Sequence, residues 1–160
     1  MNVSLPAAAS YAAFVVMLVV VSAVDIRTHT IPNRLVAAGI LLLAASVAAR
    51  ALPLGQSLAG MAAAGGLMFL VALLGRGAMG MGDVKVSLVI GGFLGWPRVL
   101  TAMFFSFILV AVAGLLLLAL RVKGRKDFIP FGPFLAAGAL LGLILGNRVL
   151  AWYLARWIRG

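Results

Sequence analysis

The sequence predicts an all-α, single-domain, polytopic membrane protein with six transmembrane helices over residues 1–160. Hydrophobic residues make up 65% of the chain and charged residues only 10%, which leaves too little polar surface to cover a water-soluble globule. The chain has no cysteine, so disulfides, thiolate zinc sites and cysteine nucleophiles are excluded. We expect no cofactor and no metal. The net charge is +10, and the basic residues that cause it are scattered between apolar runs. This distribution is typical of residues that orient a protein in a lipid bilayer and not of a nucleic-acid-binding surface.

Apolar runs separated by charged or turn-forming residues mark the predicted spans. No Lys or Arg precedes the first run, so it lacks the charged region of a cleavable signal peptide, and we expect its N-terminus outside. The second run is short and lies between Arg34 and Arg50, whose long side chains can reach the interfaces. The predicted spans are about 7–25, 34–50, 57–75, 78–97, 99–120 and 128–147, and residues 148–160, with Trp152, Tyr153 and Trp157 among arginines, form a predicted interfacial tail.

The fourth predicted span has an unusually short uncharged part. Residues 86–97 are uncharged and give about 18 Å of helix, against a hydrocarbon core of about 30 Å. A span of normal length must therefore include Asp83 and Lys85, or else be a short helix whose inner end opens into a wet cavity. Either geometry places Asp83 near the membrane boundary and inside the protein.

The distribution of basic residues predicts the orientation, because Lys and Arg gather in cytoplasmic loops. The connections after spans one, three and five hold more of them than the opposite side, so we expect these connections in the cytoplasm. The first group is Arg27, Arg34, Arg76, Lys85, Arg121, Lys123, Arg125 and Lys126, and the second is Arg50, Arg98, Arg148, Arg156 and Arg159.

The acidic residues are only three, and two of them lie at the ends of predicted spans. Asp25 ends the first span and Asp83 begins the fourth. Asp127 lies in a basic loop, where we expect it to form an ion pair that contributes little to stability. Spans one and four run in opposite directions, so the topology brings Asp25 and Asp83 to the same face at the same depth. An ionisable group in a membrane costs about 2.5–3.5 kcal/mol on insertion scales, which indicates a function.

Two carboxyl groups at one site cannot both ionise cheaply, so one keeps its proton while the other stays charged. Such a pair can activate water against a peptide carbonyl, as an aspartic protease does. Gly80 and Gly82 would leave room for a substrate strand and allow a loose helix start. Lys85 either tunes Asp83 or marks the interface, and both readings stay open.

Glycines recur at four-residue spacing on two of the predicted helices. This spacing indicates close helix packing, and the residues are Gly91 and Gly95 on one helix and Gly138, Gly142 and Gly146 on another.

Three motifs together resemble those of the prepilin peptidase (type IV leader peptidase) family, in the right order over essentially the whole chain. They are Asp25 with Ile31-Pro32-Asn33, Gly80-Met81-Gly82-Asp83-Val84-Lys85, and Ile129-Pro130-Phe131-Gly132-Pro133-Phe134. The resemblance implies that Asp25 and Asp83 form a catalytic pair at the cytoplasmic face of the inner membrane. Pro32, Pro130, Gly132 and Pro133 are selected with these motifs as site-shaping residues. The stretch from Pro130 to Phe134 is interpreted most simply as the start of a helix, with lining of the substrate groove as the alternative, and Pro32 is able to open the helix that follows it. The implied partner is a type IV prepilin or pseudopilin, whose short basic leader is cleaved, typically after a glycine at the edge of the hydrophobic helix.

Many family members carry a large cytoplasmic domain with a four-cysteine zinc site between the first two spans, and also N-methylate the new terminus. This chain has only the short loop from Asp25 to Arg34 there and no cysteine. It therefore resembles the short, peptidase-only form used with Flp-type pili or with archaeal preflagellins, and we do not expect methyltransferase activity. The Ile-Pro-Asn element resembles the short form and the Pro-Phe-Gly-Pro-Phe element the long one, so the substrate subtype stays open, as does the oligomeric state.

Two alternatives remain at this point. One is a presenilin-type intramembrane protease, which shares a Gly-x-Gly-Asp element but usually carries its partner acid in a Tyr-Asp pair, where this chain has Val24-Asp25. The other is a small non-enzymatic transporter or pilus-assembly scaffold with an Asp–Lys couple in its path. A transporter should tolerate Asp25→Asn if Asp83 carries the ion, whereas a two-aspartate protease should lose activity with either substitution.

Overall fold

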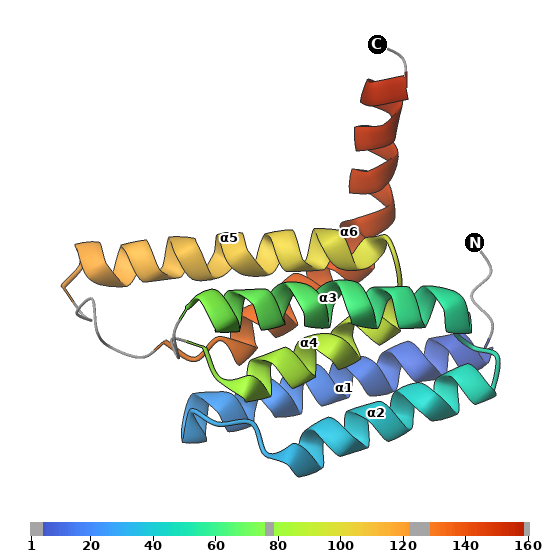
Figure 1. Cartoon of the computed structure of the whole chain (residues 1–160), viewed down its shortest axis with the longest axis horizontal. Coiled ribbons are helices and arrows are strands. Elements are labelled where there is room, and N and C mark those ends of the chain that lie inside the picture. The colour runs from blue at the N-terminus through green and yellow to red at the C-terminus, as the bar shows by residue number, and fades with distance from the viewer. Residues whose placement is uncertain (1–4, 76–78, 122–128, 159–160) are drawn as a thin grey trace.

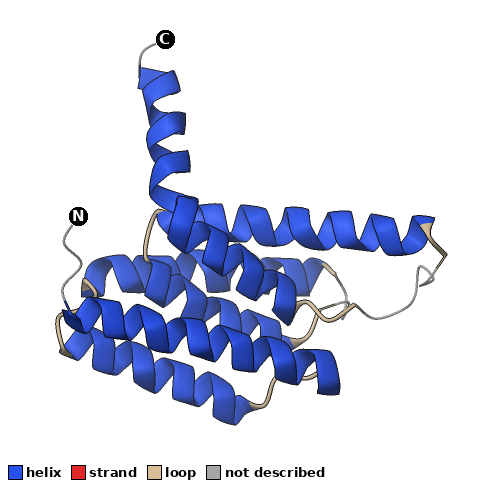
Figure 2. Ribbon diagram, turned by 180° about the vertical axis from the view of Figure 1, so that it is seen from behind, coloured by secondary structure: helices blue, strands red, loops and turns tan. Residues whose placement is uncertain are grey.

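The computed structural model describes residues 5–75, 79–121 and 129–158, and these residues form a bundle of six helices (Figure 1). Figure 2 shows the described residues as helices joined by loops, so the predicted all-α fold is confirmed. Expectations that concern Arg76, Lys123, Arg125, Lys126, Asp127, Arg159 or the side chain of Trp157 lie outside the described part. The helices are α1 Leu5–Thr28, α2 Asn33–Ala48, α3 Leu54–Leu74, α4 Met81–Leu94, α5 Arg98–Ala119 and α6 Gly132–Ile158.

Successive helices run in opposite directions along the bundle (Figure 1). The end of α1, the start of α4 and the start of α6 therefore meet at one end of the molecule, although they are far apart in the sequence. The start of α1 and the end of α6 lie toward the other end. This arrangement places Asp25, in the last turn of α1, at the same end as Asp83, in the first turn of α4.

Four of the helices are long and apolar enough to cross a membrane, and these are α1, α3, α5 and α6. The other two are shorter than the predicted spans 34–50 and 78–97, since α2 has 16 residues and α4 has 14. A helix of the length of α4 spans only about 21 Å. Helix length alone therefore supports four spans, and the six-span count stays a prediction.

Helix α4 lies inside the bundle and packs against α2, α3, α5 and α6. Its buried side includes Val86, Val89, Ile90 and Phe93, and the ring of Phe93 stacks on Phe14 of α1 with centroids 4.5 Å apart. Because its neighbours cover it, α4 needs less contact with lipid than a peripheral span does. This cover fits its short length and lets its first turn carry polar groups.

Glycines set the closest helix contacts. On α3 and α4, a β-carbon added to either Gly60 or Gly91 would collide with the backbone carbonyl of the other residue. On α6, Gly138 lies against Ser106 of α5, and Gly142 lies against Ala102. The expectation that Gly91, Gly138 and Gly142 allow close helix packing is therefore confirmed.

Helix α6 continues without a break to Ile158, past the predicted end of the span at residue 147. Its C-terminal part turns away from the bundle and runs across the direction of the other helices (Figures 1 and 2). Trp152 and Tyr153 on this part are exposed. The predicted tail is thus helical, and its place at a membrane interface stays a prediction.

Candidate active site

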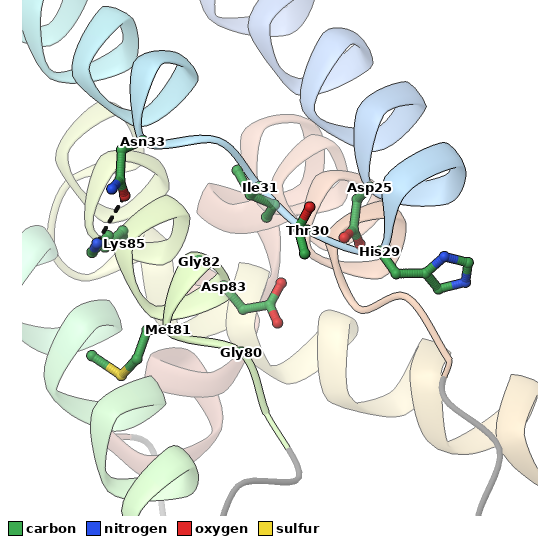
Figure 3. A pocket seen from close by; sticks show the side chains of 10 residues that line it. All are labelled: Asp25, His29, Thr30, Ile31, Asn33, Gly80, Met81, Gly82, Asp83 and Lys85. Carbon is green, nitrogen blue, oxygen red and sulfur yellow. Dashed lines mark hydrogen bonds between the residues drawn. The ribbon is translucent and has the colours of Figure 1, made fainter.

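The carboxyl groups of Asp25 and Asp83 share one cavity of about 310 Å³. Both residues are buried, with exposed fractions of 3% for Asp25 and 6% for Asp83. Figure 3 shows their side chains entering the cavity from different helices and pointing toward one another. Since buried carboxyl groups are rare without a partner or a function, this cavity is the candidate active site.

Asp25 is held by the first residue of α6. The backbone N–H of Gly132 donates a hydrogen bond to Asp25 Oδ2 over 2.8 Å. The first N–H groups of a helix have no partner within that helix, so the start of α6 has this donor free for a carboxyl group. A β-carbon at position 132 would lie 2.7 Å from Asp25 Oδ2 and 3.0 Å from Asp25 Cγ. Only glycine brings this amide so close without moving one of the two partners.

The start of α6 is fixed by the residues before Gly132. The carbonyl of Phe131 accepts hydrogen bonds from the N–H groups of Phe134 and Leu135, each over 3.0 Å, and so begins the helix. The ring of Phe131 is buried and lies 6.0 Å from the ring of Phe107 on α5. Packing of Phe131 on α5 thus helps to place the amide of Gly132 beside Asp25.

The two glycines at the start of α4 have different surroundings. A β-carbon on Gly82 would lie 3.1 Å from Cβ of Ile31, whereas the nearest atom to one on Gly80 is Asp83 Oδ2 at 3.5 Å. Gly82 therefore makes room for the protein's own chain between α1 and α2, and Gly80 borders the open cavity. Gly80 is also the extended residue before α4, and its carbonyl accepts the N–H of Asp83 over 3.1 Å.

Lys85 is directed at Asn33 and not at Asp83. Its Nζ donates a hydrogen bond to Asn33 Oδ1 over 2.9 Å, and Figure 3 shows the two aspartates on the other side of the cavity. Residues two apart on a helix point in different directions, and the amine of Lys85 is directed to Asn33 although both Lys85 and Asp83 line the cavity. The sequence left two readings open for Lys85. In the structure its amine binds Asn33, so it does not act on the carboxyl group of Asp83 by direct contact.

The three predicted prolines lie around the cavity and do not line it. Pro32 is the exposed residue before α2, and Pro130 is half-buried before α6. Pro133 lines a separate apolar groove between α1 and α6, with a volume of about 320 Å³. The cavity itself is lined by Asp25, His29, Thr30, Ile31, Asn33, Gly80, Met81, Gly82, Asp83 and Lys85.

Sequence reasoning missed the lining residues His29, Thr30, Ile31, Asn33 and Met81. The available signal was the Ile31-Pro32-Asn33 element, of which only the proline was selected. Within the described residues, no three His, Cys, Asp or Glu side chains gather as a metal site. The lining thus brings together two carboxyl groups, which are able to exchange protons, and the amine of a lysine.

The chain is similar to type IV leader peptidases both in its family match and in its individual relatives. Residues 12–115, which include both aspartates, match the type IV leader peptidase family. A prepilin leader peptidase/N-methyltransferase of Bacillus subtilis (strain 168) is 34% identical over 145 residues, which cover 88% of this chain and 57% of the relative. Relatives of the same name from Legionella pneumophila and Pseudomonas aeruginosa are 36% and 32% identical over 80 residues, 50% of this chain and 28% of theirs. The chain thus spans about half of the Bacillus relative and less of the others. No solved structure matches it.

Proposed function

Because the chain belongs to the type IV leader peptidase family, we propose that it is a membrane aspartic endopeptidase that removes the leader peptide of type IV prepilins or prepilin-like proteins. The observation that carries this proposal is the burial of Asp25 and Asp83 in one cavity at the same end of the bundle. The bacterial relatives and the apolar helices indicate a protein of the bacterial inner membrane. We further propose six spans, with the N-terminus outside and the cavity at the cytoplasmic face.

The proposed reaction uses the two carboxyl groups in complementary protonation states. The ionised carboxylate takes a proton from water while the water oxygen bonds to the carbonyl carbon of the scissile peptide. The protonated carboxyl donates a hydrogen bond to the carbonyl oxygen. When the tetrahedral intermediate collapses, the C–N bond breaks and the leaving amine receives a proton from the pair. The N–H of Gly132 keeps the carboxyl group of Asp25 in place through these steps.

The test is co-expression of a type IV prepilin with the wild type, Asp25→Asn or Asp83→Asn, followed by a mobility shift and by sequencing of the new N-terminus. Asparagine keeps the size of aspartate but cannot exchange the proton, so processing should stop in both variants. Asp127→Asn is the matched control, because it removes the remaining acidic residue of the chain and should leave processing unchanged. Folding of each variant is checked by its thermal transition in detergent. Processing by either folded active-site variant would contradict the proposal and favour a transporter or scaffold.

A further inference from the structure

The connection between α1 and α2, together with the first residue of α2, contacts the start of α4 at two points. Ile31 packs against the backbone of Gly82, where a β-carbon would lie 3.1 Å from Ile31 Cβ. Asn33 accepts the hydrogen bond from Lys85, over 2.9 Å and across 52 positions of sequence. Asp83 lies between Gly82 and Lys85 in α4, and Asp25 lies in the last turn of α1 before this segment. The two contacts therefore join the pieces of chain that carry the two carboxyl groups.

One direct contact between α1 and α4 lies farther along the helices. The stacked rings of Phe14 and Phe93 lie three turns from Asp25, about 16 Å along α1. At that distance the ring contact alone does not fix the separation of the two helix ends, and on the α1 side Asp25 is also held by the amide of Gly132 on α6. The contacts made by Ile31 and Asn33 act beside the carboxyl groups themselves (Figure 3).

We propose that Asn33 and Lys85 are positioning residues whose hydrogen bond sets the separation of Asp25 and Asp83. This inference rests on the proposed peptidase function, and it assigns Lys85 a role other than charge compensation of Asp83. The amine lies at one side of the cavity and joins the start of α2 to α4 (Figure 3). Neither side chain needs to touch the substrate for this role. Because displacement of a catalytic group by about 1 Å can cost about 100-fold in rate, loss of the hydrogen bond should lower kcat more than it changes KM.

The first test is a double-mutant cycle on the purified protein with a prepilin substrate. Asn33→Ala and Lys85→Met should each lower kcat by about 10- to 100-fold, and the double variant should be no worse than the poorer single one. Asn33→Asp keeps an oxygen that accepts a hydrogen bond from the Lys85 amine, so its kcat should stay within about threefold of the wild-type value. When Lys85 is replaced as well, this protection of kcat should be lost. Losses that multiply in the double variant, or a change confined to KM, would overturn the proposal.

The chain offers a matched control at the other end of the bundle. Arg98 Nε donates a hydrogen bond to Asn147 Oδ1 over 2.6 Å, which also joins a cationic side chain to an asparagine across two helices. Asn147→Ala should leave kcat unchanged. An equal loss of kcat in Asn147→Ala and Asn33→Ala would mean that both act through general stability, which would overturn the positioning role.

A second measurement does not depend on activity. The chain lacks cysteine, so Ile26→Cys and Met81→Cys, both at exposed positions, accept a spin-label pair across the ends of α1 and α4. In lipid nanodiscs, Asn33→Ala should broaden or lengthen the distance distribution, and Asn33→Asp should not. An unchanged distribution in Asn33→Ala would overturn the inference. If the distribution changes but the wild type cleaves no prepilin, the proposed function fails and the structural role of the pair stands.

Discussion

The N–H of Gly132 and the carboxyl group of Asp25 are joined by a hydrogen bond of 2.8 Å across 107 positions of sequence. This contact gives the Pro-Phe-Gly-Pro element a place in the candidate active site, although its prolines do not line the cavity. The element brings a helix start against one of the two aspartates. The element contributes a backbone amide, that of Gly132, to the candidate active site and not a reactive side chain.

Gly132→Ala should lower peptidase activity by about 100-fold. The added β-carbon would lie 2.7 Å from Asp25 Oδ2, so either the carboxyl group or the start of α6 must move. Overpacking of this kind also costs about 1–3 kcal/mol of stability. Cleavage rates and thermal unfolding of the purified variant measure the two effects separately.

The control for that variant is Gly114→Ala on α5. The nearest atom to its β-carbon would be Ile129 Cδ1 at 3.7 Å, an ordinary contact. This substitution should leave both activity and the unfolding temperature near those of the wild type. Wild-type activity in Gly132→Ala would contradict the role given to the amide contact.

The two glycines of the Gly-x-Gly-Asp element should respond differently to alanine. Gly82→Ala pushes a methyl group to 3.1 Å from Ile31 Cβ, whereas for Gly80→Ala the nearest atom is Asp83 Oδ2 at 3.5 Å, an ordinary contact. We expect Gly82→Ala to lower the cleavage rate about 10-fold or more by displacing the α1–α2 segment. Gly80→Ala should retain more activity, and the comparison of kcat between the two purified variants is the measurement. The reverse order would show that substrate access past Gly80 matters more than packing at Gly82.

The contact between α3 and α4 should be the most sensitive to added volume. Gly60→Ala and Gly91→Ala each place a methyl group into the facing backbone carbonyl, which a side-chain rotation cannot relieve. We expect losses of about 1–3 kcal/mol or more for each, read as a lower unfolding temperature in detergent. Gly66→Ala has nothing within 4 Å of its β-carbon and should be neutral. Unchanged stability of Gly60→Ala would contradict the close α3–α4 packing.

The proposed orientation can be tested with single cysteines, because the chain contains none. Arg27 at the end of α1 and Arg50 after α2 are both exposed and lie at opposite ends of the bundle. In intact cells with a permeabilised outer membrane, a membrane-impermeant maleimide should label Arg50→Cys and spare Arg27→Cys until the cells are lysed. Labelling in the opposite order would place the cavity outside the cytoplasm.

Much of the helix arrangement was predictable from the sequence, because long apolar runs bounded by charges give strong signals. The predicted run 99–120 and the observed α5, Arg98–Ala119, differ by one residue at each end. The position of Asp25 and Asp83 at the same end of the bundle was also predictable from alternating helix directions, whereas their shared cavity depends on how the helices pack. The short α4 was foreseen only as one of two options, and the continuation of α6 to Ile158 was missed.

The contacts that complete the candidate site were not predictable from the sequence. The amide of Gly132 meets Asp25, and Lys85 meets Asn33, through packing between segments far apart in the chain. A single sequence marks such residues as polar or small but does not show which partner they face. The predicted prolines were selected with their motifs, and the structure places them at helix starts beside the cavity.

The central claim is that Asp25 and Asp83 act as one unit on a peptide bond. The most direct measurement is the cleavage rate of a purified prepilin by the reconstituted wild type, Asp25→Asn, Asp83→Asn and the double variant. Members of one catalytic unit are strongly non-additive, so each single variant should lose about 1,000-fold or more and the double variant should be no slower than either. Substantial cleavage by one single variant, or losses that multiply in the double variant, would contradict the claim.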